Sequence, residues 1–182
     1  MKLIDLVTVV TGILPYILLI SGILNGKIKQ SFATWVLWCI LDIIVVWEVV
    51  TQHGNYLLYS VFALGTLLTA ISLIYKKIFS WGRFETFISI LVTLCIAVII
   101  ICGSHYGIIF TTTALNIAGI PQLKDTFQNP KSTSKTAYLL FALSGMLSTI
   151  GAESWSVEER LPSMSAMIYC LLILLFSLRR TS

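Results

Sequence analysis

Seven unbroken apolar stretches, each close to the length of a membrane-spanning helix, constrain this chain of 182 residues more than any other feature. The hydrocarbon core of a bilayer is about 30 Å thick, and roughly 20 residues of helix are needed to cross it. In lipid, backbone polar groups find partners only within helices or closed barrels, and barrel strands alternate apolar and polar residues. These stretches do not alternate, so they predict transmembrane helices over residues 3–24, 32–50, 56–75, 84–102, 106–127, 136–152 and 162–178.

The composition favours an all-α membrane protein and argues against several other classes. Hydrophobic residues make up 57% of the chain and charged residues 11%, whereas soluble domains carry roughly 25% charged residues. The net charge of +4 is spread over short loops without a basic stripe, so nucleic acid is not a predicted partner. Catalytic motifs are absent and the cysteines lack metal-ligand spacing, so we predict neither an enzyme nor a cofactor or metal site.

Positive residues are distributed unevenly between the two faces of the predicted bundle. Ten of the twelve Lys and Arg residues lie near the ends of the first, third, fifth and seventh stretches, and the other two are Lys2 and Arg160. Because Lys and Arg concentrate on the cytoplasmic side, we expect a multi-pass protein with its N-terminus outside and its C-terminus in the cytoplasm. The expected partners are membrane lipid and a small-molecule solute. The choice of membrane and assembly into a homo-oligomer stay open.

The chain also contains an internal repeat. An offset of 103 residues aligns Ser31 with Ser134, Trp35 with Tyr138 and Lys76 with Arg179, and an offset of 106 aligns Pro15 with Pro121. We therefore predict a three-helix repeat over residues 1–78, a linker helix within 79–103 and a second three-helix repeat over 104–182. Three crossings would insert the second copy upside down, so the linker helix is needed to make the two copies parallel.

A motif in each copy resembles a known family. Gly119-Ile120-Pro121-Gln122 is followed by the basic loop with Lys131 and Ser132, and Gly12-Ile13-Leu14-Pro15-Tyr16 precedes the loop with Lys27 and Lys29. This pattern, with its 3 + 1 + 3 layout, resembles the PQ-loop superfamily, which includes the SWEET sugar transporters and the cystinosin-like exporters. The first copy departs from the motif because Tyr16 replaces the glutamine. The resemblance implies transport of a small polar solute by alternating access, with or without proton coupling.

The resemblance leaves the substrate open among sugars, amino acids and vitamins. Sugar carriers of this family have asparagines in the middle of the third and seventh helices, and stretches 56–75 and 162–178 contain none at that depth. This departure argues against a sugar and leaves organic cations open as well. The alternative function is that of a seven-helix receptor or sorting protein, which would use the same architecture without moving a solute.

An acidic residue stands in the middle of the second stretch. Asp42 lies 11 residues beyond Ser31, or about 16 Å along a helix that rises 1.5 Å per residue, which is near the centre of the bilayer. A carboxylate there costs on the order of 2.5–3.5 kcal/mol on insertion scales and usually faces the bundle interior. We expect Asp42 to couple protons or to bind a substrate ammonium group. The alternative is a protonated acid that bonds a neighbouring helix.

Three other residues are candidates for the wall of a substrate path. Trp38 and Trp47 flank Asp42 in the sequence, and indole rings stack on sugars and cover cations, although tryptophan in a span also serves packing. Asn116 lies near the membrane midplane, where it would bind substrate or join helices. Glu48 is nearer to the outer surface, and we expect it to reach the interface.

Prolines supply the candidate hinges. Pro15 and Pro121 each remove one helical hydrogen bond and free a carbonyl, so we expect a pair of inner-gate hinges; the alternative is a pair of static kinks. Tyr16 and Gln122 follow these prolines and are expected to bond the opened backbone across the repeat axis. Pro162 is expected to open the last helix, where its missing N–H costs nothing.

Overall fold

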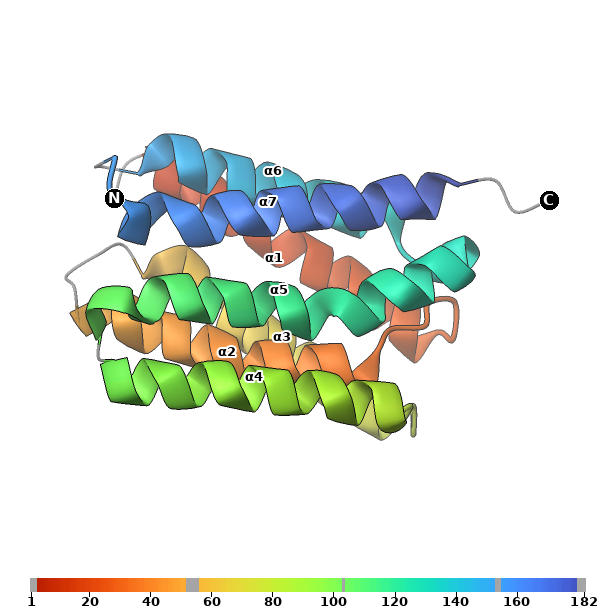
Figure 1. Cartoon of the computed structure of the whole chain (residues 1–182). Coiled ribbons are helices and arrows are strands. Elements are labelled where there is room, and N and C mark those ends of the chain that lie inside the picture. Colours follow the sequence, from red (N-terminus) through yellow and green to blue (C-terminus); the bar gives the residue numbers. More distant parts are fainter. Residues whose placement is uncertain (1–2, 52–55, 103, 153–154, 180–182) are drawn as a thin grey trace.

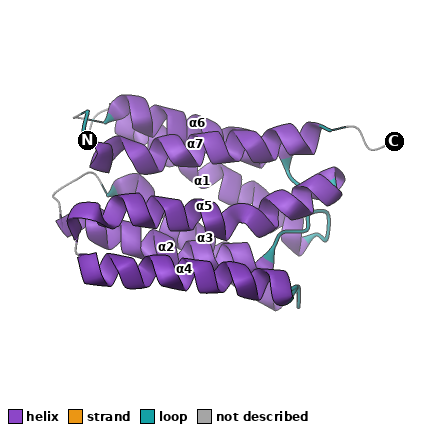
Figure 2. Ribbon diagram, in the orientation of Figure 1, coloured by secondary structure: helices purple, strands orange, loops and turns teal. Residues whose placement is uncertain are grey.

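The computed structural model describes residues 3–51, 56–102, 104–152 and 155–179, so Lys2 and Arg180 of the charge count lie outside the described residues. Within these ranges the chain is all-α, and short loops join its helices (Figures 1 and 2). The helices are α1 (Leu3–Leu24), α2 (Phe32–Thr51), α3 (Leu57–Tyr75), α4 (Arg83–Cys102), α5 (Ser104–Gln128), α6 (Lys135–Gly151) and α7 (Val157–Leu178), with a short 3-10 helix, η1 (Pro130–Ser132). The predicted seven helices are confirmed, with ends that differ by a few residues.

Five of these helices are long and apolar enough to cross a membrane, namely α1, α2, α3, α4 and α7. The other two fall short for visible reasons. The α6 helix has only 17 residues, and α5 carries Thr111, Thr112, Thr113 and Asn116 within its apolar run. The chain is therefore a helical, multi-pass membrane protein by length and composition.

The helices pack in a consistent pattern. The α3 helix packs against both α1 and α2, and α7 packs against both α5 and α6. Between these two groups, α1 contacts α6 and α2 contacts α5. The α4 helix lies against α5 at the edge of the bundle, where 17% of its spanning residues are buried, compared with 56% in α2. Helix α2 is thus central and α4 is peripheral.

The basic residues gather at one end of the bundle. The connections after α1, α3 and α5 lie at the same end as the C-terminus of α7, while α1 begins at the opposite end (Figure 1). Those connections carry Lys27, Lys29, Lys76, Lys77 and Lys131. At the opposite end Arg160 stacks on the Trp155 ring at 3.8 Å and donates to the carbonyl of Thr149 at 2.7 Å. The charge asymmetry of the sequence therefore runs along the bundle axis.

The prediction that Pro162 opens the last helix is wrong. Helix α7 begins at Val157, and the side chain of Ser156 caps it by accepting a hydrogen bond from the backbone N–H of Glu159. This Ser-x-x-Glu spacing is a helix-start signal, and it takes effect more than one turn before the proline. Pro162 consequently lies inside α7, where its ring faces a cavity described below.

The close contact between α6 and α7 depends on Gly145. A Cβ atom added there would lie 2.9 Å from the carbonyl oxygen of Ser163 and 3.0 Å from the backbone nitrogen of Met167. Both atoms belong to the backbone of α7 and cannot turn away. The two helices would have to separate to admit even a methyl group.

We predict that Gly145→Ala destabilises the protein by about 1–3 kcal/mol through this overpacking, measured as a lower melting temperature in detergent. Gly12→Ala is the matched control, because its added Cβ would meet only side-chain atoms of Leu58, Ser144 and Val61. Both changes gain about 1 kcal/mol of helix propensity, so the difference in stability between the two variants reports the backbone clash alone. Equal melting temperatures for the two variants would contradict the close α6–α7 contact.

Candidate functional site

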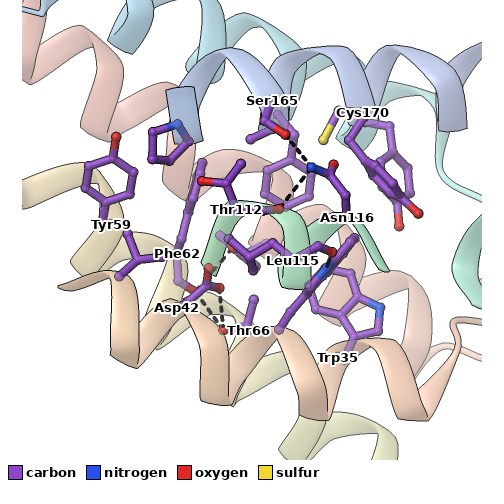
Figure 3. Close-up of a pocket in the computed structure, with 18 residues that line it drawn as sticks. Trp35, Asp42, Tyr59, Phe62, Thr66, Thr112, Leu115, Asn116, Ser165 and Cys170 are labelled. Carbon is purple, nitrogen blue, oxygen red and sulfur yellow. Dashed lines mark hydrogen bonds between the residues drawn. The ribbon is translucent and has the colours of Figure 1, made fainter. Parts of the chain in front are cut away.

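A cavity of about 90 Å³ lies in the middle of the bundle (Figure 3). All the helices except α4 contribute to its walls. A cavity needs roughly 10–15 Å³ of this measure to hold one water molecule, so this one has room for several waters or a small organic solute. Such a space inside an otherwise close-packed bundle is the candidate binding site.

Eight of the 18 residues that line the cavity are aromatic. From the first three helices the wall takes Tyr16, Trp35, Trp38, Tyr59 and Phe62, and from the last two it takes Tyr138, Phe141 and Tyr169. The rings meet edge to face, with centroid distances of 4.8 Å for Tyr16–Phe141, 5.3 Å for Trp35–Trp38 and 5.9 Å for Trp38–Tyr169. This geometry is the favoured one for aromatic pairs, and it gives the cavity stiff walls.

Asp42 lies in the wall of this cavity and is 8% exposed. Its Oδ2 accepts a hydrogen bond from the hydroxyl of Thr66 on α3 at 3.1 Å. No other residue of the cavity wall, all of which lies within the described part of the chain, carries a formal charge. The expectation that Asp42 faces the bundle interior agrees with this position.

Asn116 lies on the opposite wall and links α5 to α7. Its amide nitrogen donates to the carbonyl of Thr112 at 2.9 Å and to the hydroxyl of Ser165 at 2.7 Å. Figure 3 shows the Asp42–Thr66 pair and the Asn116–Ser165 pair on opposite sides of the space. The structure therefore brings Asp42 and Asn116 into one site.

The two candidate tryptophans have different environments. Trp38 lines the cavity and its indole N–H donates to the carbonyl of Leu115 on α5 at 2.9 Å. Trp47 is 60% exposed and does not line the cavity. A helix turns about 100° per residue, so Trp38 lies about 40° from Asp42 and Trp47 about 140° away from it. The structure therefore does not bring Trp47 together with Asp42, and its ring lies on the outer surface of the bundle.

Hydrogen bonds close the basic end of the bundle beneath the cavity. The backbone N–H of Lys29 donates to the carbonyl of Ser132 at 3.1 Å, so the loop after α1 pairs with the loop after α5. The backbone N–H of Ser31 donates to Oε1 of Gln122 at 2.9 Å. Gln122 is completely buried and its nitrogen donates to Thr126. These bonds hold the two loops together.

Gln30, which the sequence analysis did not single out, completes this closure. Its Oε1 accepts hydrogen bonds from the hydroxyl of Tyr138 at 2.8 Å and from the indole N–H of Trp35 at 3.2 Å. Trp35 and Tyr138 are residues that the 103-residue offset aligns. Buried tyrosine hydroxyl and tryptophan N–H groups usually have a hydrogen-bond acceptor, but the sequence does not indicate that Gln30 supplies it to both.

The two candidate hinge prolines lie outside the cavity wall, whereas Tyr16 lines it. Pro15 and Pro121 are buried inside the continuous helices α1 and α5, and neither lines the cavity. The C-terminal part of α5 turns away from the line of its first part (Figure 1). The Tyr16 hydroxyl donates to the carbonyl of Phe62 on α3 at 3.3 Å. The bonds of Tyr16 and Gln122 thus run to Phe62 and Ser31, and differ from the expected bonds to carbonyls freed by proline.

Glu48 is completely buried, which contradicts the expectation that it reaches the interface. Its Oε1 accepts a hydrogen bond from the hydroxyl of Thr111 on α5 at 3.1 Å. Gly107 makes the space for it, because a Cβ added there would lie 2.3 Å from Oε1 of Glu48. Gly107 and Thr111 are one helical turn apart, so a gap next to a hydroxyl admits the carboxyl group between α2 and α5.

We predict that Gln122→Ala destabilises the closed end, because it leaves the buried N–H of Ser31 without its acceptor. An unsatisfied buried donor costs about 1–3 kcal/mol, which would appear as a lower melting temperature of the purified protein in detergent. Gln128→Ala on the same helix is the control, since Gln128 is exposed. Equal melting temperatures for the Gln122→Ala and Gln128→Ala variants would contradict the proposed closure.

Comparisons with family models, with curated proteins and with solved structures find no match for this chain. The resemblance to the PQ-loop superfamily therefore stays a prediction that rests on its motifs. The cavity and the closed end are therefore the features from which a function can be assigned.

Proposed function

We propose that this chain is a membrane transporter of the PQ-loop type that moves a small polar solute by alternating access. The observation that carries the proposal is the cavity within the bundle, with Asp42 and Asn116 on opposite walls, above an end where hydrogen bonds join the segment between α1 and α2 to α5 and the loop after it. Ionisable and amide groups in the middle of a membrane bundle mark solute or ion paths in general. A purely structural bundle would fill such a space with side chains.

The packing pattern supports the proposed repeats. Exchanging α1, α2 and α3 for α5, α6 and α7 converts each contact of the first group into one of the second, and converts the α1–α6 contact into the α5–α2 contact. This is the pattern expected of two parallel three-helix units with α4 as their linker. Binding sites in transporters built from repeats lie near the midplane, between the repeats. The cavity takes its walls from both groups.

The proposed topology places the basic end in the cytoplasm and the N-terminus outside. The closed end is then the inner gate. Opening it breaks three contacts, namely Lys29 with Ser132, Ser31 with Gln122 and Gln30 with Tyr138. At about 0.5–1.5 kcal/mol net for each bond, opening costs roughly 1.5–4.5 kcal/mol, a gap that leaves the open state accessible.

The proposed hinges lie above this gate. A proline frees the carbonyl four residues before it, which is that of Thr11 in α1 and that of Ile117 in α5. The helix segments beyond Pro15 and Pro121 carry Tyr16 and Gln122, and they lead into the two loops that form the closure. Bending at the prolines would therefore separate the loops without unfolding the helices above them.

We predict that locking the gate stops transport. Purified full-length protein in liposomes should equilibrate at least one labelled solute from a panel of sugars, amino acids, vitamins and organic cations. Lys29→Cys with Ser132→Cys, in an active background whose native cysteines are replaced, should form a disulfide because their backbones are already bonded. Oxidation should then lower the initial uptake rate at least about tenfold, and a reductant should restore it.

The single-cysteine variants are the controls and should keep their uptake under oxidant. Uptake that continues through the cross-linked protein would show that this end is no gate. Binding of a panel solute without any equilibration would favour the alternative of a receptor or sorting protein on the same architecture.

A further inference from the structure

The cavity wall contains an acidic side chain and no basic one. Asp42 carries the single carboxyl group in its wall, and no Lys, Arg or His lies among its lining residues, all of which are described. The cationic groups of the chain that the structure describes lie instead in the end loops and at the helix ends. A negatively charged solute would therefore meet a carboxyl group without any compensating positive charge, whereas a positively charged solute would meet a partner.

Asp42 receives little support from the protein itself. Its one hydrogen-bond partner is the hydroxyl of Thr66, which also lies 2.9 Å from the carbonyl of Phe62 and 3.1 Å from that of Ala63. A threonine hydroxyl has a single hydrogen to donate, so three acceptors compete for it. A buried carboxylate with at most one shared hydrogen bond needs a proton or a cation to offset its desolvation.

An aromatic ring lies next to Asp42 in the cavity wall. Trp38 precedes Asp42 by one helical turn and so shares its face of α2. The plane of Trp38 stands at 81° to that of Trp35 and at 83° to that of Tyr169. In such edge-to-face pairs one ring points its edge at the other, and the face of a tryptophan ring attracts ammonium groups more strongly than that of any other side chain.

The opposite wall offers hydrogen-bonding groups that the protein does not use. The Thr112 carbonyl can only accept, so the Asn116 amide must turn its nitrogen toward it, and its Oδ1 remains an acceptor. The hydroxyl groups of Thr112 and Tyr169 are buried without a hydrogen-bond partner among the described residues. The Asn116 oxygen suits a hydroxyl, amino or amide donor at the far end of a bound solute.

We propose that the transported solute is a small organic cation. Its ammonium group lies beside Asp42 and the ring of Trp38, and its polar end faces Asn116. Figure 3 shows Asp42 and Asn116 on opposite sides of the space. This inference rests on the proposed transport function and narrows it to one class of substrate.

The first test uses the unaltered full-length protein in detergent. Choline and ethanolamine are compared with glucose and with the neutral analogue of choline in which a carbon atom replaces the nitrogen. At least one of the cations should raise the melting temperature and bind at least about tenfold more tightly than the neutral analogue, which has the same shape. Choline alone would indicate a site for quaternary ammonium, and ethanolamine alone would indicate a site that needs N–H donors. Equal binding of the neutral analogue, tighter binding of glucose, or no binding of either cation would overturn the proposal.

The second test removes the charge. Asp42→Asn should lose at least about tenfold in affinity for the cation while it keeps any weak affinity for the neutral analogue. Glu48→Gln is the matched control, because Glu48 is also buried on α2 but lies outside the cavity. Undiminished cation binding by a folded Asp42→Asn variant would refute the assignment. If that variant fails to fold, the comparison of choline with its neutral analogue on the unaltered protein still tests whether the site prefers a cation.

Uptake by proteoliposomes separates this inference from the transport function. Equilibration of a neutral or anionic solute, with no binding of cations, would leave the transporter intact and overturn the cation site. Binding of a cation that depends on Asp42, without its equilibration, would support the cation site and overturn transport.

Discussion

The arrangement of this bundle depends on the need of one carboxyl group for polar surroundings in an apolar medium. Asp42 lies deep in α2, and lipid offers it nothing. The hydroxyl of Thr66 on α3 is its partner, and the amide and hydroxyl groups of α5 and α7 collect on the other side of the same space. The helices that supply these groups are held by contacts between α2 and α3, between α2 and α5 and between α5 and α7. These hydrogen bonds join α2 to α3 and α5 to α7 around the cavity, and apolar packing fills the remainder.

Much of the helix layout could be predicted from the sequence, because the length and continuity of apolar runs report directly on lipid thickness. The face of a helix on which a residue lies was harder to predict from the sequence. Trp38 and Trp47 both flank Asp42 in the sequence. Because a helix turns by 100° per residue, Trp38 lies on the cavity side of α2 and Trp47 lies on its outer side. Pro162 was misplaced because the capping serine before α7 lies in a polar segment that does not count as part of an apolar run.

Tertiary partners were the least predictable part of the site. Glu48 was expected at the interface because its depth in α2 was known, whereas its burial depends on Gly107 and Thr111 of α5. Gln30 gave no signal of its own, since a glutamine in a basic loop is ordinary. Its role follows from Trp35 and Tyr138, which approach it from two helices far apart in the sequence. Contacts of this kind come from packing and not from any local pattern.

The cavity and the closed end share residues, and this gives a physical route from binding to opening. Trp35 and Tyr138 present their rings to the cavity, while their polar tips hold Gln30 in the closure. In the proposed transporter, a solute that settles against these rings would change how well they pack, and so it would act on the same side chains that keep the two loops together. A ligand shifts a conformational equilibrium only by its difference in affinity for the two states. The shared rings are where such a difference would arise, since they cannot move without altering both the cavity wall and the hydrogen bonds beneath it.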